Sequence, residues 1–238
     1  MTVAAVILAA TPASALADVE GTPNVRRLVD VAWAGGAVPV VVTAPDPDGS
    51  VVRALAGASA TYAEPAPANV GPVGQICRAI DVAREAVSET SAALVWPARM
   101  AWVDAETVTS LIEAHGTDDG AVLRPTYGGE AGWPALVPLV HLEVLRALPA
   151  DRMPADLLAE LATRVPTRLV ELGDPGAVHD IETARGDLPE YDGPPQPAGG
   201  HVHEWGSGAA EMHDDGPLEG PALAPYGQAA AEVPDQPG

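Results

Sequence analysis

The sequence has no lysine and no phenylalanine, and it contains a single cysteine, Cys77. Its twelve basic residues are therefore all arginines, against 33 acidic residues, which gives a formal net charge of −21. A chain this acidic repels the phosphates of nucleic acids and of anionic membranes, so we expect neither as a partner. One cysteine cannot form an intrachain disulfide, which is typical of a reducing compartment.

No stretch reaches the ~20 apolar residues that a membrane helix needs. The apolar start, residues 1–17, ends in Ala-Leu-Ala and resembles a signal peptide, but the first basic residue is only Arg26. Because a signal peptide begins with positive charge, we interpret residues 3–9 instead as a buried first strand and expect a cytoplasmic protein. A signal peptide remains the second interpretation.

Apolar runs and helical spacings alternate along most of the chain. The β-branched run at 38–43, Val-Pro-Val-Val-Val-Thr, is typical of a strand that is buried on both faces. The alternation predicts an α/β fold, a three-layer doubly wound and mostly parallel sheet. The expected strands are 3–9, 38–43, 60–63, 92–96, 120–124, 168–172 and 177–181, and the expected helices are 23–35, 51–56, 73–87, 105–115 (capped by Asp104), 138–148 and 154–163.

The composition changes at residue 189. Residues 189–238 are rich in proline, glycine and acidic residues and contain no basic residue. Such a segment buries too little apolar surface to offset its ordering, so we predict a folded domain at 1–188 and an acidic tail that is disordered in isolation. Trp205 and Tyr226 are the aromatic residues through which the tail would order on a partner protein.

Five segments, in order, resemble the MobA-like nucleotidyltransferases, the family that attaches CMP or GMP to molybdopterin. They are residues 6–10 (Val-Ile-Leu-Ala-Ala), 35–43, 103–108, 124–134 and 180–188. The resemblance implies a nucleotidyltransferase or glycosyltransferase-A-like fold, in which ligands bind at the carboxyl ends of the strands.

The family's chemistry requires positive charge. Its first loop, LAAG-x-S-x-R-x-G-x-x-K, supplies glycine amides, an arginine and a lysine to a triphosphate, and an aspartate after the central strand holds Mg²⁺. Here the glycine of LAAG is Thr11 and the metal aspartate position holds Arg99. The lysine position falls on Asn24 if residues 21–24 are matched to G-x-x-K, or on Glu20 without a gap. Each lost charge-assisted contact removes about 1.5–3 kcal/mol of phosphate binding, so several losses should abolish it.

The matched positions still define candidate sites. The resemblance assigns nucleotide or phosphate binding to Ala10, Thr11, Asn24, Arg99 and Arg124, the acceptor pocket to Gly129, Trp133 and Pro134, and metal binding to Asp180 and Glu182. If the family activity survives, Arg99 and Asp180 would be its catalytic groups, with Mg²⁺, CTP or GTP, and molybdopterin as ligands. The alternative for Arg99 is an ion pair with Asp180 or Asp104, and the alternative for Asp180 and Glu182 is solvation or pairing with Arg124.

Three functions are therefore open. We favour a non-catalytic accessory or structural subunit, or a chaperone, of a larger complex such as a molybdoenzyme assembly, contacting its partner through the tail. The second is an active cytidylyl- or guanylyltransferase acting on molybdopterin or another phosphorylated acceptor. The third is a cofactor-carrying module that retains only the acceptor pocket.

Overall fold

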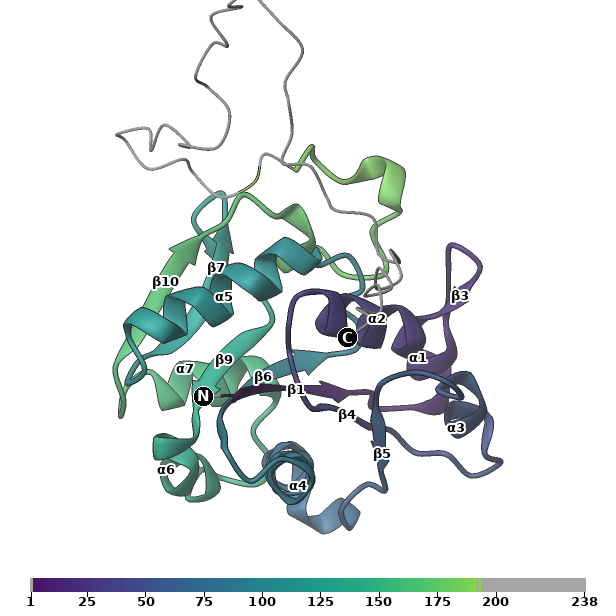
Figure 1. The fold of residues 1–238 in the computed structure, drawn as a ribbon, viewed down its shortest axis with the longest axis horizontal. Coiled ribbons are helices and arrows are strands. Elements are labelled where there is room, and N and C mark those ends of the chain that lie inside the picture. Colours follow the sequence, from purple (N-terminus) through teal and green to yellow (C-terminus); the bar gives the residue numbers. More distant parts are fainter. Residues whose placement is uncertain (1, 192, 194–238) are drawn as a thin grey trace, which may run out of the picture. The chain divides into compact units, whose positions relative to one another are not determined.

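The strand β1 (Thr2–Leu8) lies in the middle of the sheet, in parallel pairing with β4 (Val40–Thr43) on one side and β6 (Thr90–Pro97) on the other. The computed structural model describes residues 2–191 and 193. Helices cover both faces of this sheet, which confirms the three-layer α/β fold (Figure 1). Most of the predicted tail, with Trp205 and Tyr226, lies outside the described residues.

The eight-stranded sheet has the order β10-β7-β9-β6-β1-β4-β5, with β8 paired to β7. Its remaining strands are β5 (Thr61–Ala63), β7 (Val122–Tyr127), β8 (Glu130–Ala131), β9 (Ala135–Pro138) and β10 (Thr167–Glu171). All are parallel to β1 except β8 and β9, and β9 runs antiparallel between β6 and β7.

Two buried clusters hold the layers together. On one face, Ile7 of β1 packs with Leu28 of α2 (Asn24–Ala34) and Leu111 of α5 (Ala105–Thr117). On the other face, Val6 packs with Ile76 of α4 (Gly71–Ala86) and with residues of α6 (Leu142–Arg146) and α7 (Pro154–Leu161). Without phenylalanine the core is mostly aliphatic, and Trp96 is its largest fully buried side chain. The short helices are α1 (Pro12–Leu16), α3 (Ser50–Ala54) and the 3-10 turns η1 (Ala68–Val70) and η2 (Leu139–His141).

Two of the predicted elements, the helix at 138–148 and the strand at 177–181, differ from the structure, and both lie near prolines. The helix expected from Pro138 begins only at Leu142, because β9 occupies residues 135–138; a short apolar run does not distinguish strand from helix. The strand expected at 177–181 is absent, since residues 175–177 form the 3-10 turn η3 (Pro175–Ala177), capped by the side chain of Asp174. A second turn, η4 (Arg185–Asp187), follows.

The segment 18–23 also differs from the prediction. It forms a small hairpin of β2 (Asp18–Val19) and β3 (Thr22–Pro23), so α2 begins one residue later than expected, at Asn24. Across the described residues, no helix combines the length and the apolar character that crossing a membrane would require.

Candidate site at the carboxyl edge of the sheet

The parallel strands β1, β4 and β6 end at one edge of the sheet, where an open α/β fold binds its ligands. The loop after β1 leads into α1, and the loop after β6 is residues 98–103. A third segment lies against this second loop, because Ile181 N–H donates to the carbonyl of Arg99 at 2.8 Å. Five of the predicted site residues lie on these three segments: Ala10, Thr11, Arg99, Asp180 and Glu182.

The N-terminus of α1 is closed by its own side chains. Thr11 Oγ1 accepts from Ser14 N–H at 3.1 Å, and Ser14 Oγ accepts from Thr11 N–H at 3.2 Å, a reciprocal capping box. Ala10 and Thr11 are exposed at this turn. Two amides of the loop that the resemblance assigns to phosphate thus already have acceptors.

Asn24 connects the loop after β1 to the loop after β6. Its side chain is fully buried, and Nδ2 donates to the carbonyls of Ser14 at 3.1 Å and Ala98 at 2.7 Å. Its Oδ1 atom has no hydrogen-bond partner within residues 2–191 and 193. Asn24, one of the two residues that can match the family's lysine position, therefore links the chain after β1 to the loop after β6 in the interior of the domain.

Arg99 pairs with both carboxylates of the predicted metal site. Its guanidinium forms an ion pair with Asp180, as one reading of the sequence expected, and lies 3.6 Å from Glu182 Oε1. Asp180 Oδ1 also accepts from Glu182 N–H at 3.0 Å. Three cation-ligating His, Cys, Asp or Glu side chains do not converge anywhere in the described part of the chain. Since a divalent cation would meet a guanidinium here, this donor set does not fit Mg²⁺ or Mn²⁺.

Trp102 lies next to this ion pair and was not among the predicted site residues. Its indole N–H lies 3.0 Å from each of two carbonyl oxygens, those of Asp180 and Thr183. The indole therefore holds the segment after η3 against the loop after β6. The sequence offered only a weak signal for this, a tryptophan placed in a loop at the ligand-binding edge.

Two arginines lie over the Trp102 ring. The guanidinium carbons of Arg27 and Arg185 are 5.6 and 5.9 Å from its centroid, within range of a cation–π interaction. Glu20 Oε2 lies 3.8 Å from Arg27 Nη1 and 3.3 Å from Arg185 Nη1. Burial, and secondarily the charge of Arg185, lowers the pKa of Arg27. These cations are remote in sequence, and Glu20 partly neutralises them.

The predicted acceptor pocket is organised by Arg124. Its guanidinium donates to the carbonyls of Ala131 at 2.8 Å and Gly132 at 3.1 Å, and lies 5.6 Å from the centroid of the Trp133 ring. Burial lowers the pKa of Arg124. Trp133 is half-buried, Pro134 is buried, and Gly129 is exposed. Arg124 thus binds the end of β8 and the residue that follows it, and the structure does not pair it with Asp180 or Glu182 within the described residues.

Asp174 is a buried carboxylate that the sequence reasoning missed. It is 2% exposed; Oδ2 accepts from Asp104 N–H at 2.9 Å and Thr107 Oγ1 at 2.7 Å, and Oδ1 accepts from Gly176 N–H at 2.8 Å. Burial raises the pKa of Asp174, and the hydrogen bonds partly oppose that shift. This side chain fastens η3 to the start of α5.

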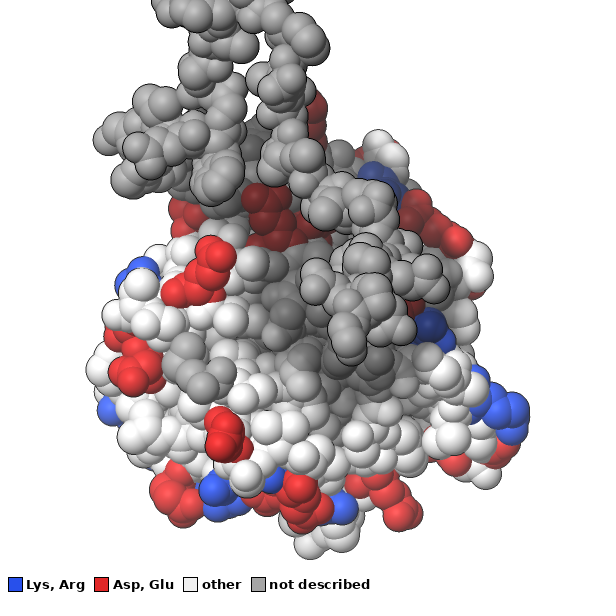
Figure 2. All heavy atoms as spheres, viewed as in Figure 1, with Lys and Arg blue, Asp and Glu red and all other residues white. Residues whose placement is uncertain are grey.

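The chain beyond η4 also contacts α5. Tyr191 Oη donates to Glu106 Oε2 at 3.2 Å, and burial raises the pKa of this tyrosine. Gly193 lies so close to Gly173 that a Cβ atom built on Gly173 would be 2.3 Å from the Gly193 carbonyl oxygen. Acidic side chains spread over the visible face of the domain, with arginines between them (Figure 2).

Residues 5–165 match the family model of the MobA-like NTP transferase domain. Rv0371c from Mycobacterium tuberculosis is 20% identical, with a TM-score of 0.60, over 79% of this chain and 96% of that one; the same protein has been solved in complex with manganese. No curated protein matches the chain.

Enzymes share the same fold. A nucleotidyl transferase from Methanothermobacter thermautotrophicus is 18% identical, with a TM-score of 0.62, over 78% of this chain and 94% of that one. The 2-C-methyl-D-erythritol 4-phosphate cytidylyltransferase from Thermus thermophilus is 20% identical, with a TM-score of 0.54, over 79% and 96%. At these identities the structural likeness establishes the fold alone.

Proposed function

Because this chain belongs to the MobA-like NTP transferase family but has an arginine where the family's metal aspartate is expected, we propose that it acts without nucleotidyl transfer. Its role is that of an accessory or structural subunit of a larger protein complex. Assemblies that handle the molybdenum cofactor, the chemistry of the named family, are the first in which to look for it.

The contact of Arg99 with Asp180 and Glu182 carries this proposal. Near a protein surface, two like unit charges 4 Å apart repel by about 4 kcal/mol. A divalent cation at that distance from the Arg99 guanidinium would be repelled by about twice as much, because it carries two charges. The guanidinium instead supplies the positive charge that the two carboxylates require. The ion pair therefore substitutes for a metal bridge between the loop after β6 and the segment after η3.

The loop after β1 supports the same conclusion. A triphosphate needs cations and free amides, but the chain has no lysine, Asn24 is buried, and Thr11 and Ser14 cap each other. Arg27 and Arg185 lie nearby, yet both share Glu20. Little positive charge remains available for a nucleotide.

The test is a titration of the full chain with CTP and with GTP, each with Mn²⁺, followed by calorimetry and by the electron paramagnetic resonance of Mn²⁺. We expect no saturable binding at millimolar nucleotide. Micromolar binding of either nucleotide, or release of pyrophosphate, would refute the proposal and establish an active nucleotidyltransferase.

A pair of variants isolates the role of the guanidinium. Arg99→Asp should place a third carboxylate beside Asp180 and Glu182 and create Mn²⁺ binding that the native protein lacks. Arg99→Gln is the matched control, because it removes the charge without adding a ligand. Tight Mn²⁺ binding by the native protein, unchanged in both variants, would contradict the assignment.

A further inference from the structure

The strand β10 is the last strand of its sheet and pairs only with β7. Pro166 accepts from Val122 N–H at 2.8 Å, and Leu172 donates to Thr126 at 3.3 Å. Bonding residues alternate along a parallel strand, so the even-numbered residues of β10 face β7. The N–H and C=O groups of Thr167, Leu169 and Glu171 therefore point away from the sheet, at a margin where Figure 1 draws no further described element.

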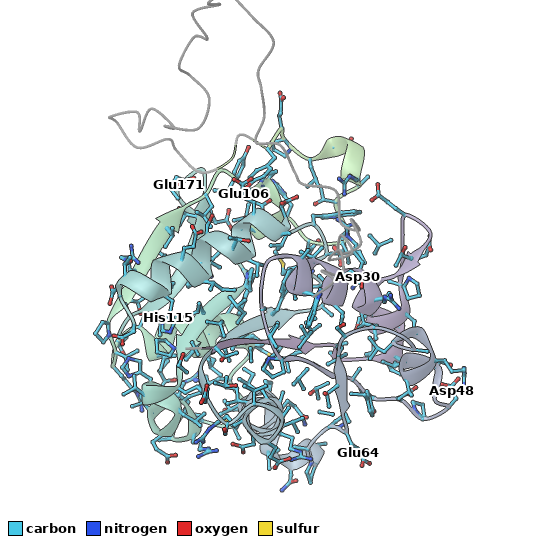
Figure 3. The ribbon with its side chains drawn as sticks, viewed as in Figure 1. Asp30, Asp48, Glu64, Glu106, His115 and Glu171 are labelled. Carbon is cyan, nitrogen blue, oxygen red and sulfur yellow. The ribbon has the colours of Figure 1, made fainter. Side chains whose placement is uncertain are left out.

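The side chains along this edge have a definite pattern. Leu169, at the centre, is 54% exposed, which is unusual for a leucine in a strand. Beside the first half of β10, Asp118 lies 3.6 Å from Arg168, and Asp119 follows it in the chain. Glu171 is the exposed end of the strand (Figure 3). The edge is thus apolar in its middle and carries net negative charge toward both ends, because Arg168 offsets only one of the two aspartates.

A second copy of the chain fits this pattern poorly. Two β10 strands paired about a two-fold axis at Leu169 would place Thr167 opposite Glu171. Each Glu171 would then approach Asp118, Asp119 and Arg168 of the other copy, a group that keeps a net negative charge, so like charges would meet at both ends. Two molecules of charge −21 also repel at long range.

We propose that the free edge of β10 binds an extended segment of another protein as an added strand, and that this segment is apolar at its centre and basic at its ends. The backbone supplies the hydrogen bonds of strand addition, and the charges select the partner. The proposal rests on the non-catalytic role argued above and names the kind of partner that role requires.

A synthetic peptide tests this surface. Its core, Arg-Arg-Thr-Val-Thr-Arg-Arg, reads identically in both directions, so it can pair in either strand orientation. We expect the full chain to bind it, with slower hydrogen exchange at the Leu169 and Glu171 amides and no change at Arg168 and Val170, which already bond to β7. Binding of the same peptide with glutamate in place of arginine should be at least about tenfold weaker.

Two controls separate strand addition from simple charge attraction. Backbone N-methylation of alternate peptide residues should abolish binding, because it removes donors and leaves the charge unchanged. Leu169→Lys should weaken binding at least about tenfold, whereas Leu169→Met should retain it. The proposal is overturned if the methylated peptide binds equally well, if no peptide binds at millimolar concentration, or if sedimentation shows that the chain dimerises through Leu169.

The outcomes of the two sets of experiments are independent. If the edge of β10 is not the interface, the peptide does not bind, and the nucleotide titration still shows no binding, so only the interface proposal is refuted. Nucleotide binding with intact peptide binding would refute the non-catalytic role and leave the interface in place.

Discussion

The indole N–H of Trp102 donates to the backbone carbonyl of Asp180, the residue whose carboxylate pairs with Arg99. Two side chains of the loop after β6, those of Arg99 and Trp102, therefore hold one segment by both its charge and its backbone. The segment after η3, residues 178–188, is thereby held at the edge of the sheet where the fold otherwise binds ligands. Trp102 is therefore the first position to test.

Trp102→Phe should lower the free energy of unfolding by about 1–2 kcal/mol, because it retains a ring for Arg27 and Arg185 but removes the indole donor. Urea denaturation measures the loss. Cleavage after Arg185 by a protease should be faster in the variant than in the native protein, under conditions in which both are folded. Unchanged stability and an unchanged cleavage rate would mean that the hydrogen bonds from the indole to the two carbonyls do not stabilise the fold.

Asp174→Asn should destabilise the domain by about 1–3 kcal/mol. Both carboxylate oxygens accept from donors, so an amide nitrogen would face an N–H or O–H group in either orientation. Thr107→Val, which removes only one of these donors, is the milder comparison. A double-mutant cycle gives their coupling, and strict additivity would contradict the hydrogen bond between the two side chains.

The fold could be predicted largely because its strands are buried on both faces. The apolar runs at 40–43 and 92–96 alternate with helical patterns, which predicted a covered parallel sheet, and Asp104 caps α5 as expected. The antiparallel β9 could not be predicted, since four apolar residues before a helical stretch carry no periodicity. The position of β9 between β6 and β7 depends on tertiary packing, which the local sequence does not reveal.

The site was predicted only where family motifs gave positions. They placed Arg99, Asp180 and Glu182, and the structure brings these three together. Arg27, Arg185 and Glu20 converge on Trp102 only through folding, because they come from α2, η4 and the β2–β3 hairpin. No spacing in the sequence could have linked them.

Gly173→Ala should detach the last described residues from the domain. Gly173 has φ +66°, and an added Cβ would be 2.3 Å from the Gly193 carbonyl oxygen, so both the backbone and the contact forbid a side chain. We expect a loss of about 1–3 kcal/mol and faster amide exchange at Tyr191. Gly57→Ala is the matched control, since Gly57 also has a positive φ, +74°, but a Cβ there meets nothing within 4 Å. Equal behaviour of the two variants would show that the approach of Gly193 is not maintained in solution.

His115 should make the protein less stable in mild acid. Its side chain belongs to the last turn of α5 and is buried (Figure 3), and neither ring nitrogen has a hydrogen-bond partner among the residues that the structure describes. Burial lowers the pKa of His115 below the ordinary value of 6.5, so the folded protein holds it neutral where the unfolded chain takes up a proton.

The sign of the pH effect follows from that difference in protons. Below pH ~6.5 the unfolded state binds one more proton than the folded state, so stability falls as the pH decreases, by at most about 1.4 kcal/mol per pH unit from this residue. The fall should continue down to the lowered pKa of the folded state and end there. His115→Leu should remove this contribution, and urea denaturation at pH 5 and pH 7 measures it as the difference between the two proteins. Equal pH dependence in the native and variant chains would show that His115 is solvated in the folded state.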